Sequence, residues 1–251
     1  MEVSSSAFDI FAEPAVDSSI VSVNGVGYIP ISAIINDSTL DFHVPAQLNN
    51  YINLSKTYLI LRIKVSQIEV DTAKGIPEKT VYLAPLTPSC LFRQVDLYLN
   101  TTLVSTSSNN YPYRAYFETL LSFPSTVKKD MLTALEHIDG VQLAESKRGS
   151  VSLECLTRIY LDMFSQSKML IPGVSLHLRL CRNSDDFIFH IPTTGSSNYQ
   201  IELEEACLYI EHVTPNPSIA LEHERRLARE TCVYPISRSV VRAYHIPSGL
   251  Q

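Results

Sequence analysis

Residues 58–65 read YLILRIKV, and this stretch determines the fold class that the sequence predicts. Apolar residues occupy every second position from Leu59 to Val65, while Arg62 and Lys64 lie on the opposite parity. Successive side chains of a strand point to opposite faces, so this alternation is typical of a strand with one buried and one solvated face. The stretch therefore predicts a half-buried strand.

Strand patterns recur along the chain, at residues 90–100, 156–164, 175–181, 187–191 and 199–213. The first of them ends at the polar corner Asn100-Thr101, which predicts a hairpin, although β-branched Thr101 tolerates a positive φ poorly. In the last, the apolar parity switches at Glu204-Glu205. One inserted residue swaps the buried face of a strand, so the switch predicts a β-bulge.

Helical patterns are few, at residues 111–121, 125–137 and 217–230. Pro112 stands in the permitted first turn of the first helix, with Asn110 as its expected N-cap. Ser125 and Ser218 are the expected caps of the other two. Many short strands with two or three short helices predict an antiparallel β-sandwich with helical insertions.

Composition excludes several classes of protein. The 251 residues are 45% hydrophobic and 18% charged, which excludes a disordered chain. No apolar run is long enough to span a membrane, and residues 1–14 lack the features of a signal peptide. The net charge of −6 arises in residues 1–50, which contain no Lys or Arg. This acidic arm is either a solvated tail or a segment that docks on a neighbouring subunit.

Five widely spaced cysteines without a C-x-x-C pair are expected to be reduced thiols, most of them small core residues, in a protein that is not secreted. None of the catalytic motifs considered is complete in this sequence. His223-Glu224 begins a zinc motif, but Leu227 occupies the place of the second histidine. Asp185-Asp186 and Glu204-Glu205 are adjacent pairs, whose side chains are expected on opposite faces of a strand. The sequence therefore predicts no enzyme, no cofactor and no metal site.

Arginines concentrate in residues 225–242, and aromatic residues in 111–117. Charged helix faces are usually just solvated, and a helix packed against a sheet accounts for the aromatic cluster better than an RNA-stacking platform does. No direct sequence-specific binding of nucleic acid is expected.

Two longer stretches carry a resemblance. LFRQVDLYLN at residues 91–100, followed by NYPYRAYFETLL at 110–121, resembles the double jelly-roll major capsid protein of Maverick/Polinton-type DNA transposons and their adintovirus relatives. The resemblance continues through weaker matches to YPI at 234–236, and YPYRAYFETLL is its specific part. The matching residues are Phe92, Gln94, Val95, Asp96, Tyr98, Asn100, Tyr111, Pro112, Tyr113, Arg114, Tyr116 and Glu118.

The resemblance implies a jelly-roll fold, a structural role without catalytic residues, self-association into a trimeric capsomer with other capsid subunits, and a place in the virion. An unassembled chain is expected inside the cell, in cytoplasm or nucleus, and no membrane contact is expected. Thr101 departs from the family's glycine at the hairpin corner. The alternatives are a single jelly-roll minor or penton capsid protein and a non-viral β-sandwich binding module.

The expected organisation is an acidic arm at 1–50 that leads into the first strands, a jelly roll at 20–213, a linker with a helix at 214–230, and the start of a second, missing jelly roll at 231–251. Because the family chain is nearly twice as long, a truncated or split copy is expected. Residues 233–246 alternate as a strand that either lies loosely across the first sandwich or pairs with another chain.

Overall fold

The computed structural model describes residues 19–34, 39–67, 81–105, 108–128, 136–137, 141–143, 150–190, 199–242 and 244. The strands are β1 (Ile20–Tyr28), β2 (Leu40–Val44), β3 (Tyr51–Gln67), β4 (Val81–Leu83), β5 (Phe92–Leu99), β6 (Thr102–Leu103), β7 (Val141–Leu143), β8 (Val151–Arg158), β9 (Leu176–Arg182), β10 (Phe189–His190) and β11 (Tyr199–Pro215). The helical elements are α1 (Thr87–Cys90), α2 (Tyr111–Ser122), α3 (Ser125–Val127), the 3-10 turn η3 (Asp162–Phe164), α5 (Asp185–Ile188) and α6 (Pro217–Leu227).

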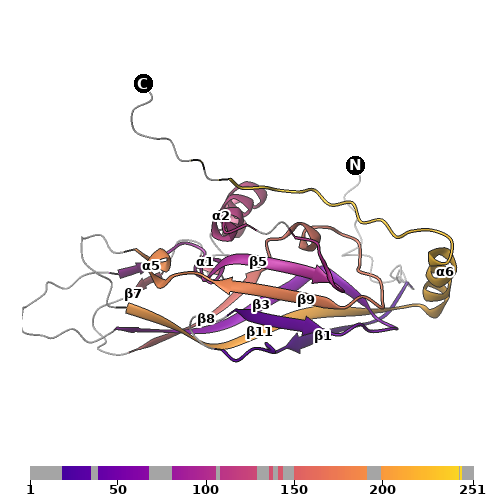
Figure 1. Ribbon diagram of the computed structural model, residues 1–251, viewed down its shortest axis with the longest axis horizontal. Helices are drawn as coiled ribbons and strands as arrows, with labels where there is room; N and C mark the ends of the chain where they lie inside the picture. Colours follow the sequence, from indigo (N-terminus) through magenta and orange to yellow (C-terminus); the bar gives the residue numbers. More distant parts are fainter. Residues whose placement is uncertain are drawn as a thin grey trace, which may run out of the picture.

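Two four-stranded antiparallel sheets form a sandwich (Figure 1). Sheet A has the order β1-β11-β3-β8, and sheet B has the order β2-β9-β5-β6. The chain crosses repeatedly between the sheets, and β1, the first strand of the described part, pairs with β11, the last one. This order is the jelly roll, and the predicted antiparallel jelly-roll sandwich is confirmed. A small third sheet, β10-β4-β7, extends the described part at one end.

The core lies between the inner faces of the two sheets. Phe42 of β2, Leu97 of β5 and Leu178 of β9 line it from sheet B, and Leu61 and Leu208 line it from sheet A; all five side chains are buried. Each contributes about 1.5–3 kcal/mol through removal of apolar surface from water. The alternation of residues 58–65 thus follows from one face of a long strand packing on the core.

Both predicted irregularities of the strands are confirmed. The register between β11 and β3 shifts between Leu203 and Glu205, which is the expected bulge. β5 and β6 pair through Leu99 and Thr102 around the corner at 100–101. Asn100 adopts the left-handed φ of 54° there, so Thr101 is spared the positive φ that would strain it.

Two predicted strands have different bounds. The strand expected at 156–164 ends at Arg158 and gives way to the turn η3, because residues 159–164 are buried consecutively rather than alternately. In the segment 187–191, α5 includes the residues up to Ile188, and Phe189 and His190 pair as a strand; residue 191 lies outside the described residues.

The helices begin near their predicted starts. Asn110 is the N-cap of α2 as predicted, whereas the caps of α3 and α6 differ from the predicted residues. Asn110 occupies the N-cap of α2 without a capping hydrogen bond from its side chain. The cap of α6 is Asn216, whose side chain accepts from Ser218 N, rather than Ser218 itself. Pro124 stands at the cap position of α3, and Ser125 is its first residue. Residues 129–135 of the second predicted helix, and residues 1–18 of the arm, lie outside the described residues.

Residues 231–242, here named the strap, contain no strand, so the strand predicted from residue 233 onward is wrong over this range. The strap runs from the end of α6 back along the sandwich on the side of β5 and reaches α2 (Figure 1). Its backbone bonds to side chains of the sandwich instead of to a neighbouring strand.

Candidate functional site

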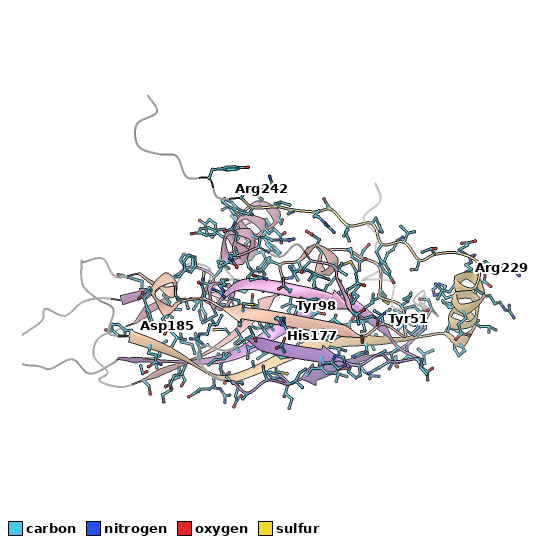
Figure 2. All side chains as sticks on the ribbon, in the orientation of Figure 1. Tyr51, Tyr98, His177, Asp185, Arg229 and Arg242 are labelled. Atoms are coloured by element: carbon cyan, nitrogen blue, oxygen red, sulfur yellow. The ribbon has the colours of Figure 1, made fainter. Side chains whose placement is uncertain are left out.

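The two halves of the recognised motif meet in space, because α2 packs on β5 (Figure 1). Within β5, Phe92 and Val95 point into the core. Gln94 Nε2 donates to Asp96 Oδ2 at 2.6 Å, and the ring of Tyr98 stacks on His177 at 5.6 Å between centroids (Figure 2). These residues therefore hold the strand and its hairpin in place.

The hairpin corner is tied to the next strand. Asn100 Oδ1 accepts hydrogen bonds from the backbone N of Ser175 at 3.0 Å and from its hydroxyl at 3.2 Å. Asn100 thus supplies both the left-handed backbone and a bond to the residue that precedes β9.

A buried ion pair fixes α2 to the sandwich. Arg114 Nη2 lies 2.6 Å from Asp162 Oδ1 and 2.9 Å from Glu118 Oε1. The side chains of Arg114 and Asp162 are only 8% and 5% exposed. Buried Tyr111 accepts from Tyr160 N at 3.3 Å, one turn before the arginine. Pro112, also buried, starts the helix without losing a bond, since its missing N–H has no partner in the first turn.

A second buried network lies beside the first. Tyr160 OH donates to Glu136 Oε2 at 2.5 Å, Arg158 N donates to Glu136 Oε1 at 3.3 Å, and Thr119 Oγ1 donates to the Tyr160 oxygen at 3.0 Å. Burial raises the pKa of the Glu136 carboxyl, and the hydrogen bonds from Tyr160 and from the backbone of Arg158 oppose this effect. Burial also raises the pKa of the Tyr160 hydroxyl. The network joins α2 to the end of β8 and stabilises the fold.

The other side of α2 is open to solvent. Tyr113, Tyr116 and Phe117 are 49%, 44% and 46% exposed, and Leu121 is 82% exposed. The expectation that the aromatic cluster packs against a sheet holds for Tyr111 and is wrong for Tyr116 and Phe117, whereas the ring of Tyr113 packs edge-on against Phe187 of α5. The hydrophobicity of the segment could not show this, because both faces of the helix carry aromatic rings.

The strap is anchored at both of its ends. Tyr234 OH donates to Met169 O at 3.1 Å and accepts from Ile171 N at 3.0 Å, and its ring packs against the core. Near the other end, Ser239 N donates to Asp162 Oδ1 at 3.2 Å, and Asn110 Nδ2 donates to Val241 O at 3.2 Å. Asp162 therefore joins α2, η3 and the strap.

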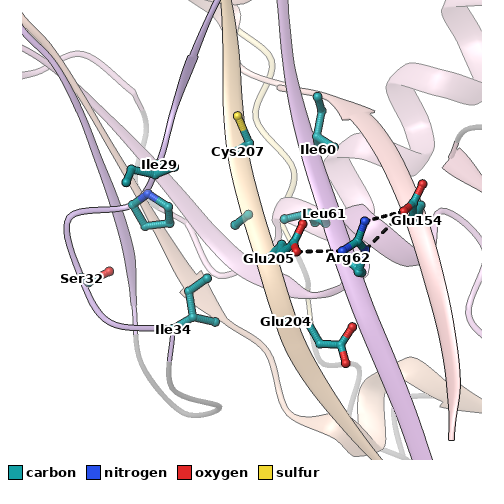
Figure 3. A pocket seen from close by; sticks show the side chains of 12 residues that line it. Ile29, Ser32, Ile34, Ile60, Leu61, Arg62, Glu154, Glu204, Glu205 and Cys207 are labelled. Atoms are coloured by element: carbon teal, nitrogen blue, oxygen red, sulfur yellow. Dashed lines mark hydrogen bonds and ion pairs between the residues drawn. The ribbon is translucent and has the colours of Figure 1, made fainter.

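A groove lies on the outer face of sheet A, between the segment that follows β1 and the strands β11 and β3 (Figure 3). Its volume is about 490 Å³. Ile29, Ile34 and Ile60 line it, and the bulge places both Glu204 and Glu205 on the exposed side. The expectation that these two carboxylates point to opposite faces is wrong, because the inserted residue breaks the alternation.

Arg62 crosses the groove between two carboxylates. Its guanidinium lies 2.7 Å from Glu154 Oε1 and 2.7 Å from Glu205 Oε1 (Figure 3). Beside the groove, Gly25 and Gly27 leave room for side chains of β11. A Cβ at Gly25 would lie 1.7 Å from Tyr209 OH, and one at Gly27 would lie 2.8 Å from Cys207 Sγ. Packing against β11 thus explains the absence of a side chain at both positions.

Residues considered as metal ligands have other partners. Asp185 pairs with Arg182 at 3.2 Å and accepts from Ile201 N, and His223 Nδ1 lies 2.8 Å from Tyr51 OH. Within the described ranges, no group of three or more His, Cys, Asp or Glu side chains could hold a metal ion. No helix in the described part of the chain is long and apolar enough to span a membrane.

Sequence comparison finds a distant relative of this chain. No protein-family model matches the chain. An uncharacterized protein of Caenorhabditis elegans is 23% identical over 213 residues, which cover 80% of this chain and 51% of that protein. The chain thus spans about half the length of the relative it matches.

Solved structures similar to this chain come from viruses. A chain of the Sputnik virophage structure has a TM-score of 0.60 and 13% identity, and the match covers 86% of this chain and 53% of that chain. PBCV-1 VP54 fitted into a reconstruction of Sputnik has a TM-score of 0.53 and 7% identity, over 84% and 46%. The PBCV-1 virus capsid has a TM-score of 0.50 and 6% identity, over 84% and 46%. The fold is thus the jelly roll of viral capsid proteins.

Proposed function

We propose that this chain is a structural capsid subunit that acts by self-association. The observation that carries the proposal is the fold. The strand order of the two sheets forms a jelly roll, and the match to a chain of the Sputnik virophage structure covers 86% of this chain. Jelly rolls recur in viral capsids because a closed sandwich presents few free edges and packs side by side as a rigid block.

Two features of the described residues support a structural role. Buried ion pairs and hydrogen bonds around Arg114 and Glu136 hold the insertion α2 rigidly on the sandwich. The helix then presents Tyr116, Phe117 and Leu121 to solvent. Exposed aromatic and aliphatic side chains grouped on a rigid element are typical of surfaces that other proteins cover.

The finer proposal concerns lineage and form. The motifs at 91–100 and 110–121 support a major capsid protein of a Maverick/Polinton-type element, with residues 20–213 as the first of two jelly rolls, a homotrimeric capsomer and a place in the virion. No catalytic activity, cofactor or sequence-specific nucleic-acid binding is part of this proposal.

Light scattering coupled to size exclusion tests the self-association. The 28.1 kDa chain is expected to elute with three times its own mass at high concentration. A variant with Tyr116→Asp and Leu121→Asp tests the α2 face, and Leu227→Asp, on the solvent-exposed α6, is the matched control. A wild-type chain that stays monomeric at every concentration, while correctly folded, contradicts the proposal.

Genomic context tests the lineage separately. In the parent DNA, genes for a protein-primed DNA polymerase, a packaging ATPase, an integrase and a cysteine protease are expected beside this one. Their absence around an intact reading frame contradicts the Maverick/Polinton assignment and leaves the capsid proposal standing.

A further inference from the structure

The groove on sheet A combines an apolar floor with a negative rim. Three carboxylates, from Glu154, Glu204 and Glu205, line it together with one cation, Arg62. Arg62 already pairs with two of them. Glu204, by contrast, is exposed and forms no ion pair within the described ranges. The groove therefore suits an extended segment in which cationic side chains alternate with apolar ones.

The strap of the same chain has this composition. Residues 231–242 contain Arg238 and Arg242 and no Asp or Glu. The side chains of Arg238, Val240 and Arg242 occupy alternate positions of the strap, and all three are exposed. Arg242 lies at the far end of the strap, beside α2 (Figure 2). The strap thus displays cations and aliphatic groups in an alternating row.

One chain cannot bring these two surfaces together. The strap is held on the side of sheet B by Asp162 and Asn110, whereas the groove lies on the outer face of sheet A. The sandwich separates them (Figure 1). Any contact between them therefore needs a second copy of the chain.

We propose that the exposed row of the strap in one copy docks into the sheet A groove of the next copy. This inference rests on the proposed capsid function and names one of its subunit contacts. The contact joins two different surfaces, so it is heterologous, and its repetition generates rings or extended arrays. Because the charged groups on both sides are solvent-exposed, the contact weakens as ionic strength rises.

Complementary charge reversal tests the contact. The groove variant carries Glu204→Lys and Glu205→Lys, and the strap variant carries Arg238→Glu and Arg242→Glu. A control reverses Glu224 and Arg229, which are equally exposed residues of α6 and the turn after it. Self-association of each full chain is measured by sedimentation velocity at low and high salt, with circular dichroism as the check on folding.

We expect each reversal alone to weaken self-association at least about 10-fold, since like charges then face each other across the contact. An equimolar mixture of the two variants, or a chain that carries all four changes, restores association, because each positive surface again meets a negative one. The control variant associates like the wild type.

The outcomes separate this inference from the capsid proposal. Wild-type self-association that neither reversal weakens, or that the combined variant fails to restore, overturns the strap-to-groove contact and leaves the capsid subunit standing. A folded wild-type chain that never associates overturns both.

Discussion

Replacement of Arg114 by methionine tests whether the buried ion pair holds α2 and the strap on the sandwich. Methionine keeps the length of the side chain and removes the charge. Asp162 then remains buried, and its Oδ1 retains only the bond from Ser239 N among the contacts described here. The change therefore strands a carboxylate in a site where its side chain is 5% exposed.

The cost follows from the burial. Removal of one partner of a buried ion pair costs about 3–5 kcal/mol, and the remaining bond from Ser239 places this case near the lower end, about 3 kcal/mol. For a domain of about 150–250 residues, 1 kcal/mol corresponds to about 2–4 °C, so the melting temperature falls by roughly 6–12 °C.

Urea unfolding followed by circular dichroism measures the free energy directly. Arg62→Met is the matched control, because the Arg62 and Glu154 side chains of that ion pair are 40% and 74% exposed. Exposed pairs contribute less than about 1 kcal/mol. The double change Arg114→Met and Asp162→Leu is expected to be more stable than Arg114→Met alone, since no buried charge is left unpaired. If Arg114→Met costs no more than Arg62→Met, the reasoning about this ion pair is wrong.

Three further predictions concern the strap, pH and the cysteines. Tyr234→Phe removes the hydroxyl that bonds Met169 and Ile171 and lowers the free energy of unfolding by about 1–3 kcal/mol in urea, whereas Tyr244→Phe, with an exposed ring, leaves it unchanged. Burial raises the folded-state pKa of Glu136 above its ordinary 4.5. The folded state therefore binds this proton more tightly than the unfolded state does. As a result, the contribution of Glu136 to stability falls as pH rises through the raised pKa. Glu136→Gln removes this fall. Unfolding curves of the wild type and the variant between pH 4 and 8 are therefore expected to show a difference in the free energy of unfolding that grows with pH. A difference that stays constant over this range contradicts the assignment. Burial raises the pKa of the Cys90 and Cys155 thiols to about 12, whereas Cys232 is exposed, so a thiol reagent at neutral pH is expected to label Cys232 first and the two buried cysteines only after unfolding.

The sandwich could be predicted because its signals are local. The parity of Leu59 to Val65 depends only on which face of β3 is buried, and the parity switch at Glu204-Glu205 depends only on one inserted residue. The corner at Asn100 was also predictable, since asparagine tolerates the left-handed backbone better than its neighbour Thr101. In each case the residues that decide the structure lie within a few positions of each other.

The contacts around α2 could not be predicted because they are not local. Arg114 pairs with Asp162, which lies 48 positions further along the chain. The strap alternates like a strand, but it crosses the sandwich at α2 and bonds to side chains rather than to a strand edge. The groove depends on the outward direction of both glutamates at the bulge, which the ordinary alternation of a strand predicts wrongly for one of them.

Electron microscopy of the purified chain at high concentration tests the central claim most directly. If the jelly roll is a capsid subunit, images show trimeric capsomers, or arrays and shells built from repeated copies of the sandwich. A preparation that circular dichroism shows to be folded, and that contains only dispersed monomers, contradicts the claim.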